Sequence, residues 1–253
     1  MSVRYTGNKI YEYIDNNALT RFVTFTDKEW LLIYGNQSNN PQLMVFAIEC
    51  NSLDEELPQK IKDNVNISFR LSKQVELPFC IIQFSNSSDN IELYWDSEWL
   101  STTFEKLTEI FNYYGLVASN AISKDINQYS SSRFHDWQRR TLGNIKVTDL
   151  DLLEINQDKS VVRIYELKRS YIPLDNWLPY QQDFVNFQLI WDTVRNSSIG
   201  FYLLYNPFYK NGYNRVDDIS KLKVFQFLEE NRTNGIELSY QEIGIFDIED
   251  VLK

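Results

Sequence analysis

The sequence predicts an α+β protein whose second half is an α/β core, a mixed β-sheet flanked by helices. The main observation is a hairpin pattern. Two apolar-rich runs, at 147–155 and 161–169, stand on either side of a polar turn at 156–159, which is typical of paired strands. A helical pattern and another apolar run follow, so the order strand, strand, helix, strand indicates a mixed sheet. The first half is dominated instead by short strand patterns between polar turns.

Length and composition predict two small domains or one large one. The chain has 253 residues, 43% of them hydrophobic and 15% aromatic, which is ample for a packed core. We divide it into a β-rich domain over 1–125 and an α/β domain over 126–253. No apolar run has the length of a signal peptide or a membrane span, so we expect no membrane partner. Cys50 and Cys80 lie far apart without metal-ligand spacing, which predicts a protein of the reducing cytoplasm.

Short strand patterns recur through the first half, at 21–25, 30–34, 43–49, 79–84 and 91–95. Polar turns separate the first three, the second of them rich in Gly, Asn and Pro, which predicts an antiparallel meander, and the last two form a second hairpin. No catalytic spacing is present in this half. Its role stays open among substrate selection, a protein-partner interface and homodimer formation.

Helical patterns in the first half are fewer. A short helix is expected at 52–63, with Pro58 interrupting it. A longer one is expected at 101–114, where Thr102 and Glu105 have the spacing of a capping box. Its aromatic stripe is of the kind that packs a sheet, so we interpret this helix as part of the core.

The register of the predicted hairpin brings charged residues face to face. If the turn is centred between Asp158 and Lys159, Glu154 lies opposite Arg163, which is a favourable cross-strand pair. The same register sets Asp151 opposite Glu166 and Asp149 opposite Lys168. The facing carboxylates of Asp151 and Glu166 repel each other unless a cation lies between them.

A divalent metal ion would relieve this repulsion. Mg²⁺ and Mn²⁺ take carboxylate oxygens as ligands, and Lys168 on the same strand face as Glu166 is placed to orient a water or stabilise negative charge. This combination is suited to phosphodiester hydrolysis. The opposing interpretation is a solvated edge on which acids and bases alternate. The hairpin is apolar on both faces, however, which favours a strand pair inside a covered sheet.

These residues resemble the core of the PD-(D/E)XK nuclease superfamily. The resemblance rests on Asp149 or Asp151, on Glu166-Leu167-Lys168, and on Gln181 or Gln182 at the start of the next helix, and it covers roughly 130–227. The Pro that often precedes the family's Asp is absent, so both aspartates remain candidates. The resemblance implies a restriction-endonuclease-like fold and a Mg²⁺-dependent endonuclease acting on DNA more readily than on RNA. It implies metal ligation by the Asp and Glu, with Lys168 and Gln181 completing the catalytic set.

A helical segment at 130–142 precedes the hairpin and supplies candidate phosphate-binding residues. Arg133, Arg139 and Arg140 lie on it, beside His135 and Asp136, and Arg169 follows the Glu-x-Lys motif. Arginine suits phosphate through its planar fork of donors. No Ser or Cys motif accompanies His135, so a surface or satisfied core residue is the simpler interpretation of it.

Net charge bears on the choice of function. The chain carries −10 at neutral pH, which is unusual for a nucleic-acid enzyme because phosphate contacts leave a basic footprint. Two further hypotheses therefore remain. One is a nuclease-like scaffold that binds nucleic acid without turnover, and the other is a protein-interaction module.

The region after the hairpin predicts the remainder of the α/β core. A helix is expected from Pro179 to about residue 195, with a buried apolar stripe. Buried strands follow at 199–205 and 222–227, separated by an aromatic loop. The acidic tail ends in a short amphipathic segment at 246–252.

Overall fold

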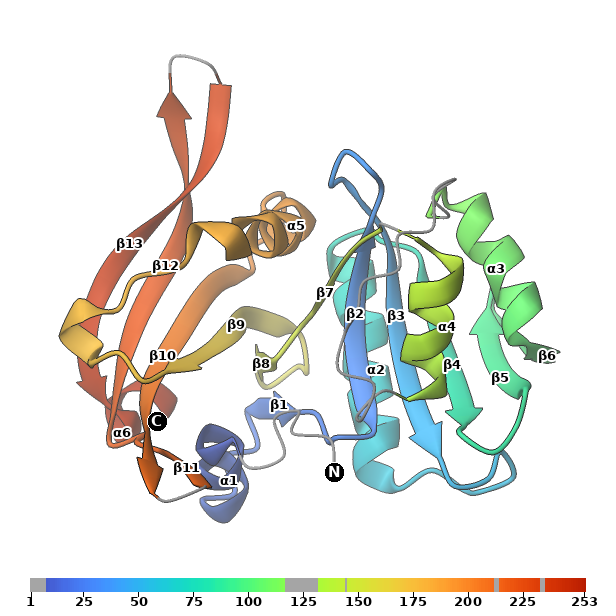
Figure 1. The fold of residues 1–253 in the computed structure, drawn as a ribbon, viewed down its shortest axis with the longest axis horizontal. Helices are drawn as coiled ribbons and strands as arrows, with labels where there is room; N and C mark the ends of the chain where they lie inside the picture. Colours follow the sequence, from blue (N-terminus) through green and yellow to red (C-terminus); the bar gives the residue numbers. More distant parts are fainter. Residues whose placement is uncertain (1–7, 117–131, 144, 212–213, 233–234) are drawn as a thin grey trace. The chain divides into compact units, whose positions relative to one another are not determined.

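The computed structural model describes residues 8–116, 132–143, 145–211, 214–232 and 235–253 (Figure 1). The chain forms two compact units. Unit 1 comprises the described residues of Phe25–Leu150, and unit 2 comprises those of Gly7–Thr24 together with Asp151–Lys253. The domain boundary expected between residues 125 and 126 lies outside the described residues. Unit 2 is therefore built from two chain segments, and the described residues of unit 1 lie between them in the sequence.

Unit 1 contains a six-stranded mixed sheet. In sheet order its strands are β6 (Glu98–Thr103), β5 (Asn90–Trp95), β4 (Phe79–Ser85), β3 (Pro41–Cys50), β2 (Glu29–Gly35) and β7 (Lys146–Asp149). Strands β3 and β4 are parallel, because helix α2 (Gln59–Gln74) connects them as a crossover. The other described pairs of this sheet are antiparallel.

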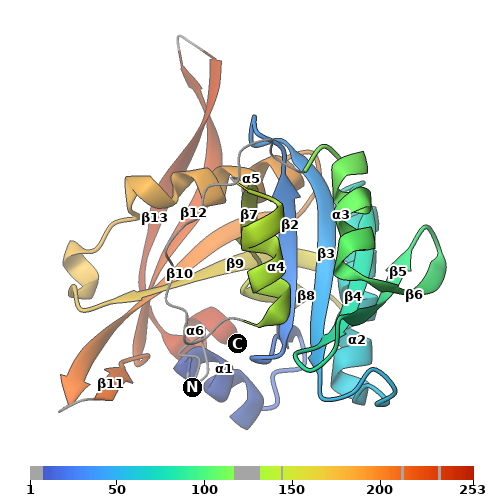
Figure 2. The same cartoon turned by 45° about the vertical axis from the view of Figure 1, so that its right-hand side comes forward.

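Helices α3 (Phe104–Tyr113) and α4 (Arg133–Thr141) cover one face of this sheet, and Figure 2 shows α2 behind it. The covered face is rich in aromatic side chains, among them Phe84, Phe111, Phe134 and Trp137. Some rings in this cluster meet edge to face, as Phe111 and Trp137 do at 5.2 Å between centroids, and others stack, as Phe84 and Phe134 do at 5.7 Å. The aromatic stripe of α3 is thus core, as the sequence predicts.

Unit 2 contains a seven-stranded mixed sheet. Its order is β1 (Phe22–Thr24), β8 (Leu152–Ile155), β9 (Val161–Ser170), β10 (Gly200–Asn211), β12 (Lys221–Arg232) and β13 (Gly235–Asp247), with β11 (Asn214–Asp217) paired to β10. Strands β9 and β10 are parallel, and helix α5 (Phe184–Val194) forms the crossover between them. The predicted order strand, strand, helix, strand is found here, and the α+β class is confirmed.

Helices cover both faces of this sheet. Helices α1 (Lys9–Asn16) and α6 (Ile248–Leu252) pack Ile10, Ile14 and Leu252 against one face. On the other face Phe187 of α5 meets Phe227 of β12 at 5.0 Å between ring centroids. Two 3₁₀ turns, η1 (Leu174–Asn176) and η2 (Gln181–Asp183), connect β9 to α5.

The predicted hairpin is present as β8 and β9, and its register is the one expected from Leu152 to Glu154. It shifts at Ile155, which pairs with Val161, and the expected pair of Asp151 with Glu166 lies just beyond the start of the ladder. Leu152 pairs with Tyr165, Leu153 with Ile164, and Glu154 with Arg163. The side-chain oxygen of Asn156 accepts bonds from the backbone N–H groups of Asp158 and Ser160, which closes the polar turn. The first strand is shorter than expected, however, because residues 147–149 form β7 in unit 1.

Several boundaries differ from the sequence expectations. In the first half, β1 pairs with β8 rather than with β2, α1 was not foreseen, and α2 begins directly after Pro58 instead of being interrupted there. Helix α3 has no side-chain cap, so the capping box is not formed. In the second half, the helix expected from Pro179 begins at Phe184, and β10 continues through the expected aromatic loop to Asn211. For β1 and β10, pairing with distant or neighbouring strands overrides the local signal.

None of the described helices is both long and apolar enough to cross a membrane.

Candidate active site

The candidate site lies at the end of β9 that leads into α5. Residues alternate between the two faces of a strand, so Glu166 and Lys168 share one face while Tyr165 and Leu167 share the other. Tyr165 and Leu167 pack in the core with α1 and α6. Lys168 projects toward α5, where its Nζ lies 5.5 Å from the ring centroid of Phe187.

Lys168 is held by two carboxylates. Its Nζ lies 2.9 Å from Glu166 Oε1 and 3.6 Å from Asp183 Oδ2, and the Glu166 side chain is buried. Burial by itself would lower the pKa of Lys168, but the charges of Glu166, Asp183 and Asp151 outweigh it and raise the pKa above its usual value of 10.5. Lys168 is therefore a protonated, fixed cation at physiological pH.

Asp151 lies next to this cluster, immediately before β8. Its Oδ2 accepts a hydrogen bond of 2.8 Å from the backbone N–H of Leu167, and its own backbone oxygen accepts one from the hydroxyl of Tyr11 in α1. The side chain is buried. The Asp151 carboxylate is thus bound to the backbone of β9 at Leu167, between Glu166 and Lys168. Its charge contributes to the raised pKa of Lys168.

Asp183 is the residue that sequence reasoning missed. It ends the turn η2 and directly precedes α5. The signal for it was available, because a crossover helix starts beside the carboxyl end of the strand that it leaves, so an acidic residue there is expected to approach Lys168. Gln181 and Gln182, predicted for this position, lie in the same turn with exposed side chains.

The connection between β9 and α5 is anchored by a buried lysine. Nζ of Lys223 on β12 donates to the backbone oxygens of Trp177, at 3.1 Å, and Asp175, at 3.4 Å. The Trp177 ring stacks on Tyr205 with 4.1 Å between centroids. These contacts fix the path of the chain just before Asp183.

Asp151 and Glu166 suit a hard divalent cation only as a site with two protein carboxylates. Asp151 and Glu166 offer carboxylate oxygens only, and the contacts above use one oxygen of each. No group of three or more His, Cys, Asp or Glu side chains in the described part of the chain is arranged to hold a metal. Two carboxylates suffice for Mg²⁺ where waters and a substrate phosphate complete the shell, so the fit is to a two-carboxylate site.

Asp149, the alternative metal ligand, belongs to unit 1. It lies at the end of β7 opposite Leu32 of β2, so the predicted pairing of Asp149 with Lys168 is wrong. The chain leaves one sheet at Asp149 and enters the other at Leu152. A short extended run cannot reveal this change of sheet, because both strands have the same local pattern.

The residues of the helical segment before the hairpin also belong to unit 1. Arg133 pairs with Asp89, and Arg139 with Asp136 at 3.4 Å, while Arg140 is exposed on the same helix. His135 is buried, with Nδ1 2.6 Å from Ser132 Oγ and its ring edge-on to Trp30. A satisfied core residue is the interpretation of His135 that these contacts support.

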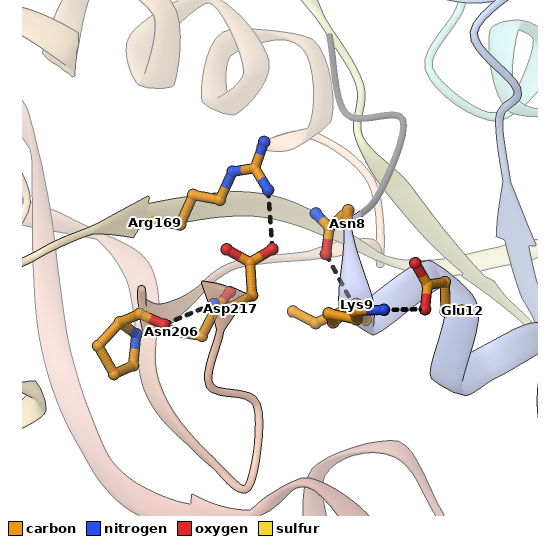
Figure 3. Close-up of polar contacts among 8 residues, drawn as sticks. Asn8, Lys9, Glu12, Arg169, Asn206 and Asp217 are labelled. Atoms are coloured by element: carbon orange, nitrogen blue, oxygen red, sulfur yellow. Dashed lines mark hydrogen bonds and ion pairs between the residues drawn. The ribbon is translucent and has the colours of Figure 1, made fainter. Parts of the chain in front are cut away.

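Arg169 lies on the face of β9 opposite Lys168. Its Nη1 binds Asp217 Oδ2 at 2.7 Å, and Figure 3 shows this pair near Asn206 and the start of α1, where Asn8 caps the helix. The Asp217 side chain is almost fully buried. Much of the charge of Arg169 is therefore balanced within the fold.

Comparisons with known proteins add no functional assignment. No protein-family model matches the chain, and no curated protein matches it. Among solved structures, the C-terminal domain of the sex pheromone staph-cAM373 precursor from Staphylococcus aureus aligns with 80% of this chain at 9% identity and a TM-score of 0.14. The chain spans 65% of that structure's length. A likeness this weak supports no inference about fold or function.

Proposed function

We propose that unit 2 is a Mg²⁺-dependent nuclease, an endonuclease that hydrolyses phosphodiester bonds, with DNA favoured over RNA. One observation carries the proposal. The ammonium of Lys168 contacts the buried carboxylate of Glu166, and the nearby charge of Asp151, which binds the backbone N–H of Leu167, acts on the same ammonium. The order of acidic residue, Glu-x-Lys strand and crossover helix supports the resemblance to the PD-(D/E)XK nucleases.

In this proposal Asp151 and Glu166 hold the metal ion. When bound, Mg²⁺ or Mn²⁺ supplies Lewis-acid polarisation of a phosphate oxygen and lowers the pKa of water. The backbone N–H of Leu167 fixes the Asp151 carboxylate, and burial keeps both carboxylates away from bulk water. The chain thereby preorganises its negative charge before substrate arrives.

Lys168 acts in the proposal as a fixed cation. Because its neighbours raise its pKa, it does not serve as a general base near neutral pH. Its ammonium instead donates to the attacking water or to the phosphate oxygen on which negative charge develops. Asp183 is the positioning residue that holds Lys168 from the α5 side.

A nuclease-like scaffold without turnover is the second candidate function. The observation that favours it is that the cation of the cluster is already paired within the fold, because Lys168 contacts both Glu166 and Asp183. A protein that binds nucleic acid or a protein partner through this fold would keep such pairs as structural contacts.

We assign the protein to the cytoplasm in this proposal. Cys50 and Cys80 are both buried free thiols, and burial is the largest cause that raises the pKa of Cys80 and that of Cys50, the latter to about 11. Unreactive buried thiols are compatible with a reducing compartment.

A cleavage assay tests the proposal. Wild-type protein is incubated with single-stranded, duplex and branched DNA and with RNA, in Mg²⁺, Mn²⁺ or EDTA. We expect metal-dependent cleavage of at least one DNA substrate, abolished in Glu166→Gln. Binding without cleavage under all of these conditions would refute the nuclease and favour the scaffold.

A further inference from the structure

A second polar groove lies at the turn end of the same hairpin. Its volume is about 850 Å³, and its lining comes from β8, β9, β10 and residues 20–21. The charged residues of the lining are Arg21, Glu154, Lys159 and Arg163. The remaining lining is mostly hydroxyl and amide side chains, so the groove is suited to a hydrated, polar ligand.

The groove has an excess of positive charge. Three cationic side chains and one carboxylate line it, in a chain whose net charge is −10. The carboxylate is that of Glu154, which is buried. Its Oε2 accepts from Arg163 Nη1 at 2.9 Å and from the Tyr165 hydroxyl at 2.7 Å, and its Oε1 lies 3.6 Å from Arg21 Nε. One carboxylate cannot balance three cations, so the potential in the groove favours an anion.

The two guanidinium groups are held in place before any ligand arrives. Arg163 lies over the ring of Tyr202 at 5.8 Å, and Arg21 lies over the ring of Phe22 at 5.0 Å. The Tyr202 ring in turn depends on Gly200, because a Cβ there would come within 2.7 Å of the ring. Each guanidinium has five donors, and the contacts to Glu154 described above involve one nitrogen of each.

The groove is separate from the candidate active site. Arg163 and Tyr165 alternate on β9 with Glu166 and Lys168 and so lie on the opposite face of the sheet. Glu154 and Lys159 also lie at the turn end of the hairpin, whereas Glu166 and Lys168 lie toward its other end. A ligand in the groove is therefore bound by residues that the proposed hydrolysis does not use.

We propose that this groove is a binding site for a phosphate-bearing ligand of nucleotide size. Planar guanidinium forks with an ammonium are the side chains that match phosphate oxygens best. The volume exceeds what a single phosphate needs and falls in the range of small-molecule sites. The ligand is a free nucleotide or the backbone of a short nucleic-acid strand, and these two sources share the same phosphate chemistry.

Calorimetric titration tests this site with three probes: pyrophosphate, a nucleoside monophosphate and a short single-stranded oligonucleotide, all in EDTA. Lys159→Asn removes one cation, and asparagine tolerates the left-handed backbone at this position, where φ is 62°. Arg21→Gln removes a second cation but leaves Glu154 its closer partners. We expect each variant to weaken binding about tenfold. The matched control Lys221→Asn lies outside the groove and should change nothing.

Saturable binding of any probe that both variants weaken supports the site, and the probe that binds identifies the source of the phosphate. Absence of saturable binding for all three probes would overturn the proposal, as would equal affinities in the variants and the control. Glu166→Gln should bind as wild type does. Because EDTA and Glu166→Gln both abolish the proposed hydrolysis, the failure of one proposal is distinguishable from the failure of the other.

Discussion

Glu154 and Glu166 are two buried glutamates on one hairpin, with 5% and 6% of their surface exposed, yet their surroundings are opposite. Glu154 is surrounded by cations and a phenol: Arg21, Arg163 and the hydroxyl of Tyr165. Glu166 shares one cation, Lys168, with Asp183 and Asp151. The two glutamates are equally buried, but their surroundings carry opposite charge. Positive charge is in excess around Glu154 at the turn end of the hairpin (the cationic end), and negative charge is in excess around Glu166 at the other end (the acidic end).

The difference shows that the neighbours of a buried carboxylate decide what it can do. The Glu154 carboxylate already has more positive charge nearby than it needs, so a metal ion would be repelled there and an anion attracted. At Glu166 the carboxylates outnumber the ammonium, so a divalent cation would be attracted. The following predictions test this contrast.

Replacing the single cation of the acidic end should give the largest effect. Lys168→Ala removes the ammonium that, in the proposed mechanism, stabilises negative charge in the transition state, so the rate constant of cleavage should fall by about 10²-fold or more. The measurement is single-turnover cleavage at saturating Mg²⁺. Arg163→Ala, on the same strand but at the other end, is the matched control and should retain cleavage. Equal losses in the two variants would mean that the ends do not differ in function.

Replacing the carboxylate of the cationic end should act on stability instead. Glu154→Gln removes the charge that holds Arg163 and Arg21 together, at a cost of about 2 kcal/mol in the free energy of unfolding. Urea denaturation measures this, and the hydrolytic activity of the folded variant should be unchanged. Loss of activity at unchanged stability would contradict the separation of the two ends.

Asp183→Asn should have a smaller effect on activity, of about tenfold. The reason is that Asp183 only positions Lys168, at 3.6 Å, while Glu166 remains in contact. The loss should appear in kcat rather than in KM, and Asp183→Glu should restore most of it. A variant that lost substrate affinity alone would show that Asp183 contacts substrate and does not position the lysine.

The smallest effect concerns pH. Because the folded-state pKa of Lys168 lies above its usual value of 10.5, its ion pairs contribute stability fully below that value and lose it only at higher pH. The difference in melting temperature between wild type and Lys168→Met should therefore stay constant from about pH 6 to pH 10. A difference that shrinks within this range would place the pKa of Lys168 below its usual value.

The hairpin and its register were predictable because they depend on local chemistry. The alternation of apolar and charged residues and the turn at Asn156 set which residues face each other, and Glu154 with Arg163 is found as expected. Glu166, Lys168 and Asp151 follow from that register. Helix α3 was also visible in the apolar spacing.

The division of the chain into two units could not be predicted from local chemistry. Strand β1 lies before residues 25–150 in the sequence and pairs with β8 after them, and nothing in a three-residue run specifies so distant a partner. Asp149 and Asp151 are two positions apart, yet the change of sheet at Leu150 separates them. The start of the crossover helix pointed to this region, but the choice of Asp183 as the partner of Lys168 depends on the path of the connection that Lys223 anchors.

In the proposed nuclease, metal-dependent hydrolysis at the acidic end of the hairpin depends on Asp151 and not on Asp149. A cleavage time course on one DNA substrate in Mg²⁺, with wild type, Asp151→Asn and Asp149→Asn side by side, tests it directly. Asp151→Asn should abolish cleavage while the metal-free protein keeps its fold. Asp149→Asn should cleave nearly as fast as wild type, because Asp149 belongs to the sheet of unit 1. Cleavage that survives Asp151→Asn but is lost in Asp149→Asn would contradict the account.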